Sequence, residues 1–288
     1  MTVLSEYTLL RRLCEADVAL YNANSLPPEL EACIKKISLI NANPTSESLK
    51  DLRALATVYF GSVHDREKPN RIESIATLLR DGRPHQGPIF DDPDMNLLRG
   101  MTYDLRVGNE AYLSSKKTPT RLDLDESQVL VIDPGDFAII ITHEYLYIPA
   151  DLMSFISVRM KYKSQGLISV SGFHVDPGFY GRIVFAVYNA GARPVVLKRK
   201  DPCFMILFEE IDKQALPPSS PSRYNGQTSI SADLIAPLQG ETVSLHRLAL
   251  KVQRLEDRYK DILLTVVVGV IFAVIAAFLG SYFAAGGH

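Results

Sequence analysis

The stretch VDPGFYGRIVFAVYNAG, residues 175–191, decides the fold class of this chain. Its middle, RIVFAVYN at 182–189, is rich in the β-branched and aromatic residues that favour strands. Asp-Pro-Gly-Phe precedes this run and Asn-Ala-Gly follows it, and both are turn sequences, because Gly and Asn tolerate unusual backbone angles and Pro presets φ. The stretch therefore predicts a strand held between two turns.

The same pattern recurs on both sides of this stretch, from Thr102 to Ile211. The other short runs of this kind are YDLRV, QVLVI, FAIIIT, MSFISV, PVVLK and CFMILFEEI. Between them the sequence shows no helix long enough for a βαβ crossover. We therefore expect a mainly β domain, a sandwich or a barrel.

The N-terminal part of the chain has a different period. Leu9, Leu13 and Leu20 fall near one face of a helix, and Pro27-Pro28 opens a second helical segment. We expect residues 1–70 to form a helical accessory region, and we find no chemistry in it.

The C-terminal part of the chain has the composition of a membrane span. No Asp, Glu, Lys or Arg occurs from residue 262 to the end, and about 20 apolar residues suffice to cross a bilayer. We therefore expect a single-pass C-terminal anchor at 262–284; the alternative is a buried core helix. Arg254, Arg258 and Lys260 precede the span and favour a cytoplasmic globular part, although acidic residues lie among them.

Residues 231–261 are expected to form a linker and an amphipathic stalk helix. Apolar residues step by three and four as in a coiled coil, for two and a half heptads, at Leu245, Leu248, Val252, Leu255, Tyr259 and Ile262. A single amphipathic helix lying on its own domain is the open alternative. Before the linker, LPPSSPS at 216–222 marks a boundary or an arm, because Pro cannot continue a helix or a central strand.

Charge and cysteine content exclude several classes of function. The 31 Lys and Arg against 33 Asp and Glu leave no basic excess, so a sequence-independent nucleic-acid binder is excluded. The three cysteines and six histidines show no metal-ligand spacing, so we predict neither a disulfide framework nor a protein-bound metal. Free thiols fit a reducing compartment such as the cytosol.

Several short motifs occur in an order that matches a known family. They are Thr102-Tyr103-Asp104-Leu105-Arg106-Val107-Gly108, Asp133-Pro134-Gly135, Asp176-Pro177-Gly178-Phe179, Tyr188-Asn189-Ala190-Gly191 and Arg223-Tyr224-Asn225-Gly226-Gln227. Together they resemble the dCTP deaminase branch of the dUTPase-like superfamily, over residues 72–230. The resemblance implies a distorted jelly-roll that assembles as a homotrimer, with deoxynucleotide sites at subunit interfaces and Mg²⁺ carried on the triphosphate.

The resemblance also assigns roles to single positions. Deamination without zinc needs one carboxylate to move a proton from water to the leaving amine, and the family places a Glu where this chain has Ala186. Asp176 occupies the place of the dUTPase Asp that orients water and selects deoxyribose. Its alternative role is that of a turn residue before Pro177.

The phosphate-binding motif of the family is altered in this chain. Arg-Ser-Ser survives only as Arg159-Met160-Lys161, which keeps a guanidinium and adds a point charge but loses the hydroxyls. The resemblance places Gly166, Tyr224 and Gln227 at the nucleotide as well.

Three functions remain open at this point. The first is a membrane-anchored, trimeric nucleotide-binding protein that has lost deamination and serves as a sensor, effector or scaffold. The second is an active enzyme, either a dCTP deaminase or a dUTP or dNTP diphosphohydrolase that uses Asp176. The third is a trimeric structural module without a ligand. The replacement at Ala186 favours the first.

Overall fold

The computed structural model describes residues 2–21, 26–40, 45–66, 72–74, 77, 87–114, 121–124, 128–211, 223–236 and 245–285. They belong to two units, Met1–Glu241 and Thr242–His288. The predicted connector at 216–222 lies outside the described residues.

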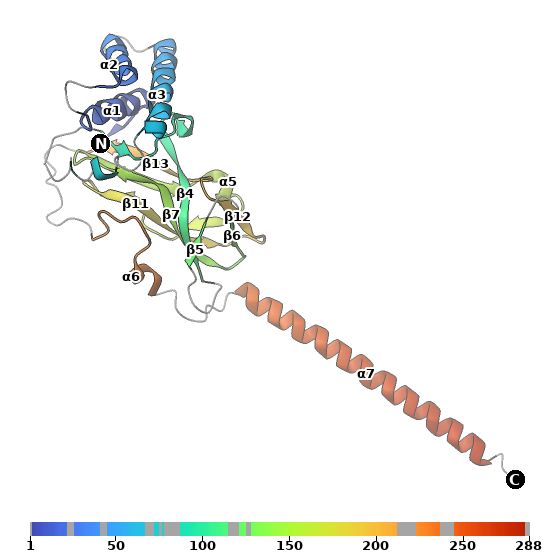
Figure 1. Cartoon of the computed structure of the whole chain (residues 1–288). Coiled ribbons are helices and arrows are strands. Elements are labelled where there is room, and N and C mark those ends of the chain that lie inside the picture. The colour runs from blue at the N-terminus through green and yellow to red at the C-terminus, as the bar shows by residue number, and fades with distance from the viewer. Residues whose placement is uncertain are drawn as a thin grey trace. The chain divides into compact units, whose positions relative to one another are not determined.

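The first unit is built on one antiparallel sheet of eleven strands (Figure 1). Its main path runs β10-β8-β13-β4-β7-β11-β9, with β1, β2, β3 and β5 paired at the sides. The strands of the path are β4 (Thr102–Leu113), β7 (Phe137–Tyr147), β8 (Leu152–Val158), β9 (Leu167–Ser169), β10 (His174–Val175), β11 (Tyr180–Asn189) and β13 (Pro202–Glu210). The side strands are β1 (Thr2–Val3), β2 (Ile89–Phe90), β3 (Leu98–Arg99) and β5 (Arg121–Asp123). A separate two-stranded antiparallel sheet pairs β6 (Val129–Ile132) with β12 (Val195–Lys198).

This arrangement confirms the prediction of a mainly β domain. Each of the seven runs read from the sequence lies in a strand, and β11 alternates between buried and half-buried residues along its whole length. The sheet curls, because β8 and β9 contact each other although they lie near opposite ends of the strand order.

Strand β4 makes the curl by changing partners midway. Its first half pairs with β13 and its second half pairs with β7. At the change, Gly108 lies so close to β7 that a Cβ there would be 2.6 Å from the carbonyl oxygen of Thr142. A residue with a side chain would therefore force the two strands apart.

An ion pair holds this change of partner in place. Arg106 lies opposite Pro202 of β13, and its Nε donates to Oε1 of Glu144 on β7 at 2.6 Å. The backbone N–H of Arg106 donates to the other oxygen of Glu144 at 2.9 Å. Glu144 is fully buried, so the carboxylate needs both donors to offset its lost hydration.

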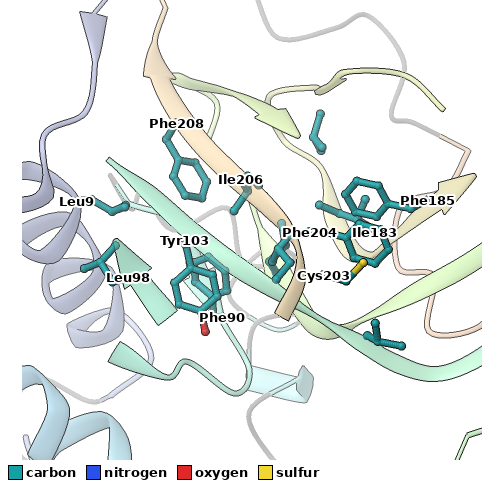
Figure 2. Packing of buried hydrophobic residues seen from close by; sticks show 14 of the residues in the cluster. Leu9, Phe90, Leu98, Tyr103, Ile183, Phe185, Cys203, Phe204, Ile206 and Phe208 are labelled. Carbon is teal, nitrogen blue, oxygen red and sulfur yellow. The ribbon is translucent and has the colours of Figure 1, made fainter. Parts of the chain in front are cut away.

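Aromatic side chains fill the space inside the curl. Phe185 of β11 stacks on Phe204 of β13, with ring centroids 3.8 Å apart, and both are fully buried (Figure 2). Phe90 and Tyr103 lie together farther along the same core, with centroids 4.7 Å apart. The core therefore joins strands from both halves of the sheet.

Three helices lie between β1 and β2 in the chain, in the region that the sequence predicts to be helical. They are α1 (Glu6–Val18), α2 (Pro28–Ile40) and α3 (Ser46–Arg66). Arg12 of α1 pairs with Asp151 at 2.8 Å and with Glu210 of β13 at 2.5 Å. These helices share one compact unit and one continuous hydrophobic core with the sheet, so they are part of its packing.

The second unit contains one helix, α7 (Leu245–Ala285). Its extent confirms that the predicted stalk is helical. Across the part of the chain whose side chains are described, no helix combines the length and the hydropathy needed to cross a bilayer. The span predicted at 262–284 is thus not confirmed, and the side chains of 277–285 lie outside the described set. The coiled coil stays a prediction.

The buried ion pair predicts a pH dependence of stability. Burial raises the pKa of Glu144 from its ordinary 4.5 to about 7, although Arg106 opposes the shift. A carboxyl group whose pKa is raised in the folded state stabilises the fold fully below the unfolded pKa, and this contribution is lost as the pH rises through the folded pKa. The contribution of Glu144 should therefore fall by roughly 3 kcal/mol between pH 4.5 and pH 7.

Urea unfolding of the wild type and of Glu144→Gln at several pH values measures this contribution. The unfolding free energy of the wild type minus that of Glu144→Gln should fall from pH 4.5 to pH 7 and level off above pH 7. Glu209→Gln controls for loss of a carboxylate. A difference that stays constant with pH would contradict the raised pKa.

Candidate functional site

A cavity of about 410 Å³ opens where the ends of the curled sheet approach each other. It is bordered by β8, by the loop before β10, by β11, by residues 224–227 and by the short helix α6 (Ala232–Ile235). Its lining residues are Ile139, Ile156, Ser171, Gly172, His174, Val175, Asp176, Phe179, Ile183, Val184, Ala186, Tyr224, Gln227 and Leu234. The walls are largely apolar and the polar groups are few, as in most small-molecule sites.

Backbone hydrogen bonds bring the loop after β9 onto β11. The N–H groups of Val170 and Ser171 both donate to the carbonyl oxygen of Ala186, at 2.8 and 3.3 Å. The chain then turns into β10, which pairs with β8 and places His174 opposite Phe155. Ala186 is therefore held beside the loop that carries the polar groups of the cavity.

The segment around Gln227 closes another side of the cavity. Gln227 forms a parallel bridge with Gly181, and its Nε2 donates to the carbonyl oxygen of Arg182 at 2.7 Å. Gly226 has a φ of +78°, which lets its N–H reach the carbonyl oxygen of Tyr180 at 2.7 Å. Oε1 of Gln227 is buried, and no described residue donates a hydrogen bond to it. This oxygen is an acceptor available to a ligand.

The titratable groups of the cavity lie at its mouth. Nε2 of His174 is 3.4 Å from Oδ1 of Asp176, and their side chains are 43% and 61% exposed. At Ala186 the cavity is lined by a methyl group, which cannot transfer a proton. The cavity thus presents one carboxylate, and it lies in contact with solvent.

The structure brings four of the predicted positions together. Asp176, Ala186, Tyr224 and Gln227 all line the cavity, although 51 positions separate the first from the last. Asp176 also supports its turn, because its carbonyl oxygen accepts from the N–H of Phe179 at 3.2 Å. Its two suggested roles are therefore compatible.

The predicted phosphate ligands do not line this cavity. Nη1 of Arg159 donates to the carbonyl oxygen of Pro202 at 2.9 Å, and its Nε lies 3.3 Å from Asp104. Lys161 is exposed, with its Nζ 4.9 Å from the ring centre of Tyr162.

Gly166 has a structural role in this chain. Its φ is +98°, and a Cβ there would lie 2.3 Å from the Cα of Gly191. The close approach lets Ala190 donate to the carbonyl oxygen of Gly166 at 2.9 Å. Gly166 therefore anchors the turn after β11.

His174 and Ser171 line the cavity, and neither was among the predicted site residues. The sequence analysis singled out no histidine, because the six histidines show no metal-ligand spacing. The spacing of two between His174 and Asp176 is the signal that could have found His174, because residues two apart in extended chain point the same way. Nothing in the sequence alone singles out Ser171.

Asp176 is the carboxylate that the cavity lining offers to a cation. Among the described residues there is no group of three or more His, Cys, Asp or Glu that could hold a metal ion. Mg²⁺ is commonly held by one or two carboxylates together with substrate phosphates, and Asp176 supplies one carboxylate. The donor set is therefore consistent with Mg²⁺ bound to a nucleotide.

Comparison with known proteins identifies the family. The profile of the dCTP deaminase-like family matches residues 73–211. The chain is 33% identical over 155 residues to the dCTP deaminase of Pyrococcus horikoshii, which covers 53% of this chain and 94% of that protein. It is 32% identical over 158 residues to the dUMP-forming dCTP deaminase of Methanothermobacter thermautotrophicus, over 48% of this chain and 80% of that one.

A solved structure of 2'-deoxycytidine 5'-triphosphate deaminase from Agrobacterium tumefaciens aligns with a TM-score of 0.37 and 18% identity. The alignment covers 49% of this chain and 47% of that chain, so this chain spans about half the length of that protein. The sequence matches carry the assignment: this chain belongs to the dCTP deaminase-like family.

Proposed function

We propose that this protein binds a deoxynucleotide in the cavity around Asp176 and Ala186 and does not deaminate it. It then acts as a nucleotide sensor, an effector or a scaffold. The observation that carries the proposal is the methyl group of Ala186, which lines the cavity at the position where the resemblance expects the general acid and base.

The remaining features of the cavity suit a nucleoside. Apolar walls from Ile156, Phe179 and Val184 suit the faces of a base, and Oε1 of Gln227 can accept from an amino or ring N–H group. Asp176 at the mouth can accept from a sugar hydroxyl. Binding therefore needs none of the groups whose loss removes deamination.

A second candidate activity rests on the pair of Asp176 and His174. A carboxylate 3.4 Å from an imidazole at the mouth can orient a water molecule toward a phosphate. The protein would then be a dUTP or dNTP diphosphohydrolase. An active dCTP deaminase with a relocated base is a weaker form of this alternative, because Asp176 is the sole carboxylate among the cavity-lining residues.

The assembly proposed from the resemblance is a homotrimer with sites at subunit interfaces. It offers a reason why Arg159 and Lys161 lie outside the cavity of their own subunit, since a neighbouring subunit's cavity would receive them.

Membrane attachment through 262–284, with a cytoplasmic globular part, is proposed from the sequence alone. Extraction of membranes at alkaline pH tests it, and release of the protein would contradict it.

The first prediction concerns deamination. With dCTP and Mg²⁺ the full-length protein should show heat of binding in calorimetry but release no ammonia. Ala186→Glu should gain ammonia release, because general acid and base catalysis contributes about 10² to 10⁴-fold. Ala186→Gln is the matched control, with the same shape and no proton to transfer. Ammonia from the wild type would overturn the loss of deamination, and absence of binding for every dNTP would overturn the nucleotide site.

The second prediction concerns Asp176. If the protein hydrolyses dUTP or another dNTP, Asp176→Asn should reduce pyrophosphate release by about 10²-fold or more, since the amide cannot take a proton from water. Glu209→Asn, in a strand away from the cavity, controls for loss of charge. Wild-type protein that releases no pyrophosphate rules out the hydrolase.

The third prediction concerns assembly. Light scattering of the full chain in detergent, corrected for bound detergent, should give three times the mass of one chain.

Arg159→Ala should weaken dNTP binding by about tenfold or more, because hydrogen bonds to charged groups are worth about 1.5–3 kcal/mol. A monomer that binds dNTP with unchanged affinity in this variant would contradict the shared site.

A further inference from the structure

A second cavity, of about 300 Å³, lies between α3 and the sheet. Thr57 and Gly61 of α3 form one wall, and residues 92–96, Arg106 and Lys200 form the rest. Because α3 lies outside the residues that match the family profile, one wall of this cavity comes from a part of the chain that the match does not include.

Arg106 is nearly buried, and its guanidinium group lines this cavity. Arg106 is 8% exposed, its Nε binds Glu144, and its Nη2 donates to the carbonyl oxygen of Asp92. In the described part of the chain nothing accepts a hydrogen bond from Nη1 of Arg106. Since Arg106 lines the cavity, Nη1 is the donor that a ligand there would meet.

Lys200 adds a second cation at the rim. It lies in the turn between β12 and β13 with a φ of +65°, and it is the one non-glycine residue with positive φ among those described. Its N–H donates to the carbonyl oxygen of Val107 at 2.8 Å, which ties this turn to the strand that carries Arg106. No described acidic group pairs with its side chain.

Both carboxylates that line the cavity, those of Asp92 and Asp94, contact other groups of the protein. Asp92 lies 2.6 Å from Nε2 of His143 and 3.3 Å from Nη2 of Arg106. Asp94 begins the short helix η1 (Met95–Leu97), where its Oδ1 accepts from the N–H of Asn96 at 2.9 Å. Besides the side-chain amide of Asn96, the donors that line the cavity are Nη1 of Arg106 and Nζ of Lys200, and these two cationic groups suit an oxyanion.

Gly61 lies in the wall of the cavity and is exposed. Glycine inside a helix destabilises it relative to alanine, so it usually serves a close approach or a positive φ. Neither applies at Gly61, because a Cβ there would meet nothing within 4 Å and its φ is not in the left-handed region. A side chain at position 61 would therefore have open space beside the cavity wall.

We propose that this second cavity binds a small oxyanion, a phosphate or carboxylate group, between Arg106 and Lys200. The site is separate from the nucleotide cavity, and neither site depends on the other being occupied.

Two variants of the full-length protein test the site without touching the buried ion pair. Gly61→Leu should fill the cavity with no clash, and Lys200→Asn should remove the rim cation, because Asn tolerates a positive φ. Lys198→Asn is the matched control, an exposed lysine two residues away and outside the cavity lining. Calorimetry and thermal unfolding with sodium phosphate, sodium acetate and sodium chloride at equal ionic strength give the affinities.

The wild type and Lys198→Asn should bind phosphate or acetate and gain thermal stability beyond that given by chloride. Gly61→Leu should lose this binding while its own unfolding temperature does not fall, and Lys200→Asn should bind about threefold or more weakly. Stronger binding of phosphate or of acetate identifies the anion class. No binding by the wild type, or equal binding by Gly61→Leu, would overturn the proposal, and dNTP binding measured on the same samples reports on the nucleotide cavity separately.

Discussion

The ion pair of Arg106 and Glu144 is the interaction on which the rest of the structure depends. It lies where β4 leaves β13 and joins β7, and the carboxylate receives both a side-chain N–H and a backbone N–H of Arg106. A buried charge is costly unless it is paired and hydrogen-bonded, so this pairing fixes where β4 changes partner. The curl of the sheet, and with it both cavities, follows from that position.

The two cavities are connected to this pair in different ways. Arg106 itself lines the smaller one, where the N-terminal helices meet the sheet. The larger one is connected to the ion pair through strand pairing. Strand β7 carries Glu144 and pairs with β11, which carries the cavity-lining Ala186. The helices are therefore not an appendage, since Arg12 and α3 pack against the elements that shape the sites.

The walls of the larger cavity do not depend on the side chain at position 186. The hydrogen bonds from Val170 and Ser171 to the carbonyl of Ala186 use the backbone alone, so they do not depend on the side chain at 186. The Gln227 segment is also held mainly by backbone contacts to β11. The cavity is therefore compatible with different side chains at position 186.

The sequence by itself determined the strands, the helical N-terminal region, the family and four residues of the larger cavity. These are properties of local period, turn residues and motif order, which a chain displays without folding. Only the tertiary structure decided that Arg159 pairs with Asp104 and that Gly166 packs on Gly191. It also decided that Arg106 meets Glu144, 38 positions away, because long-range pairing depends on the register between strands, which spacing along the chain does not specify.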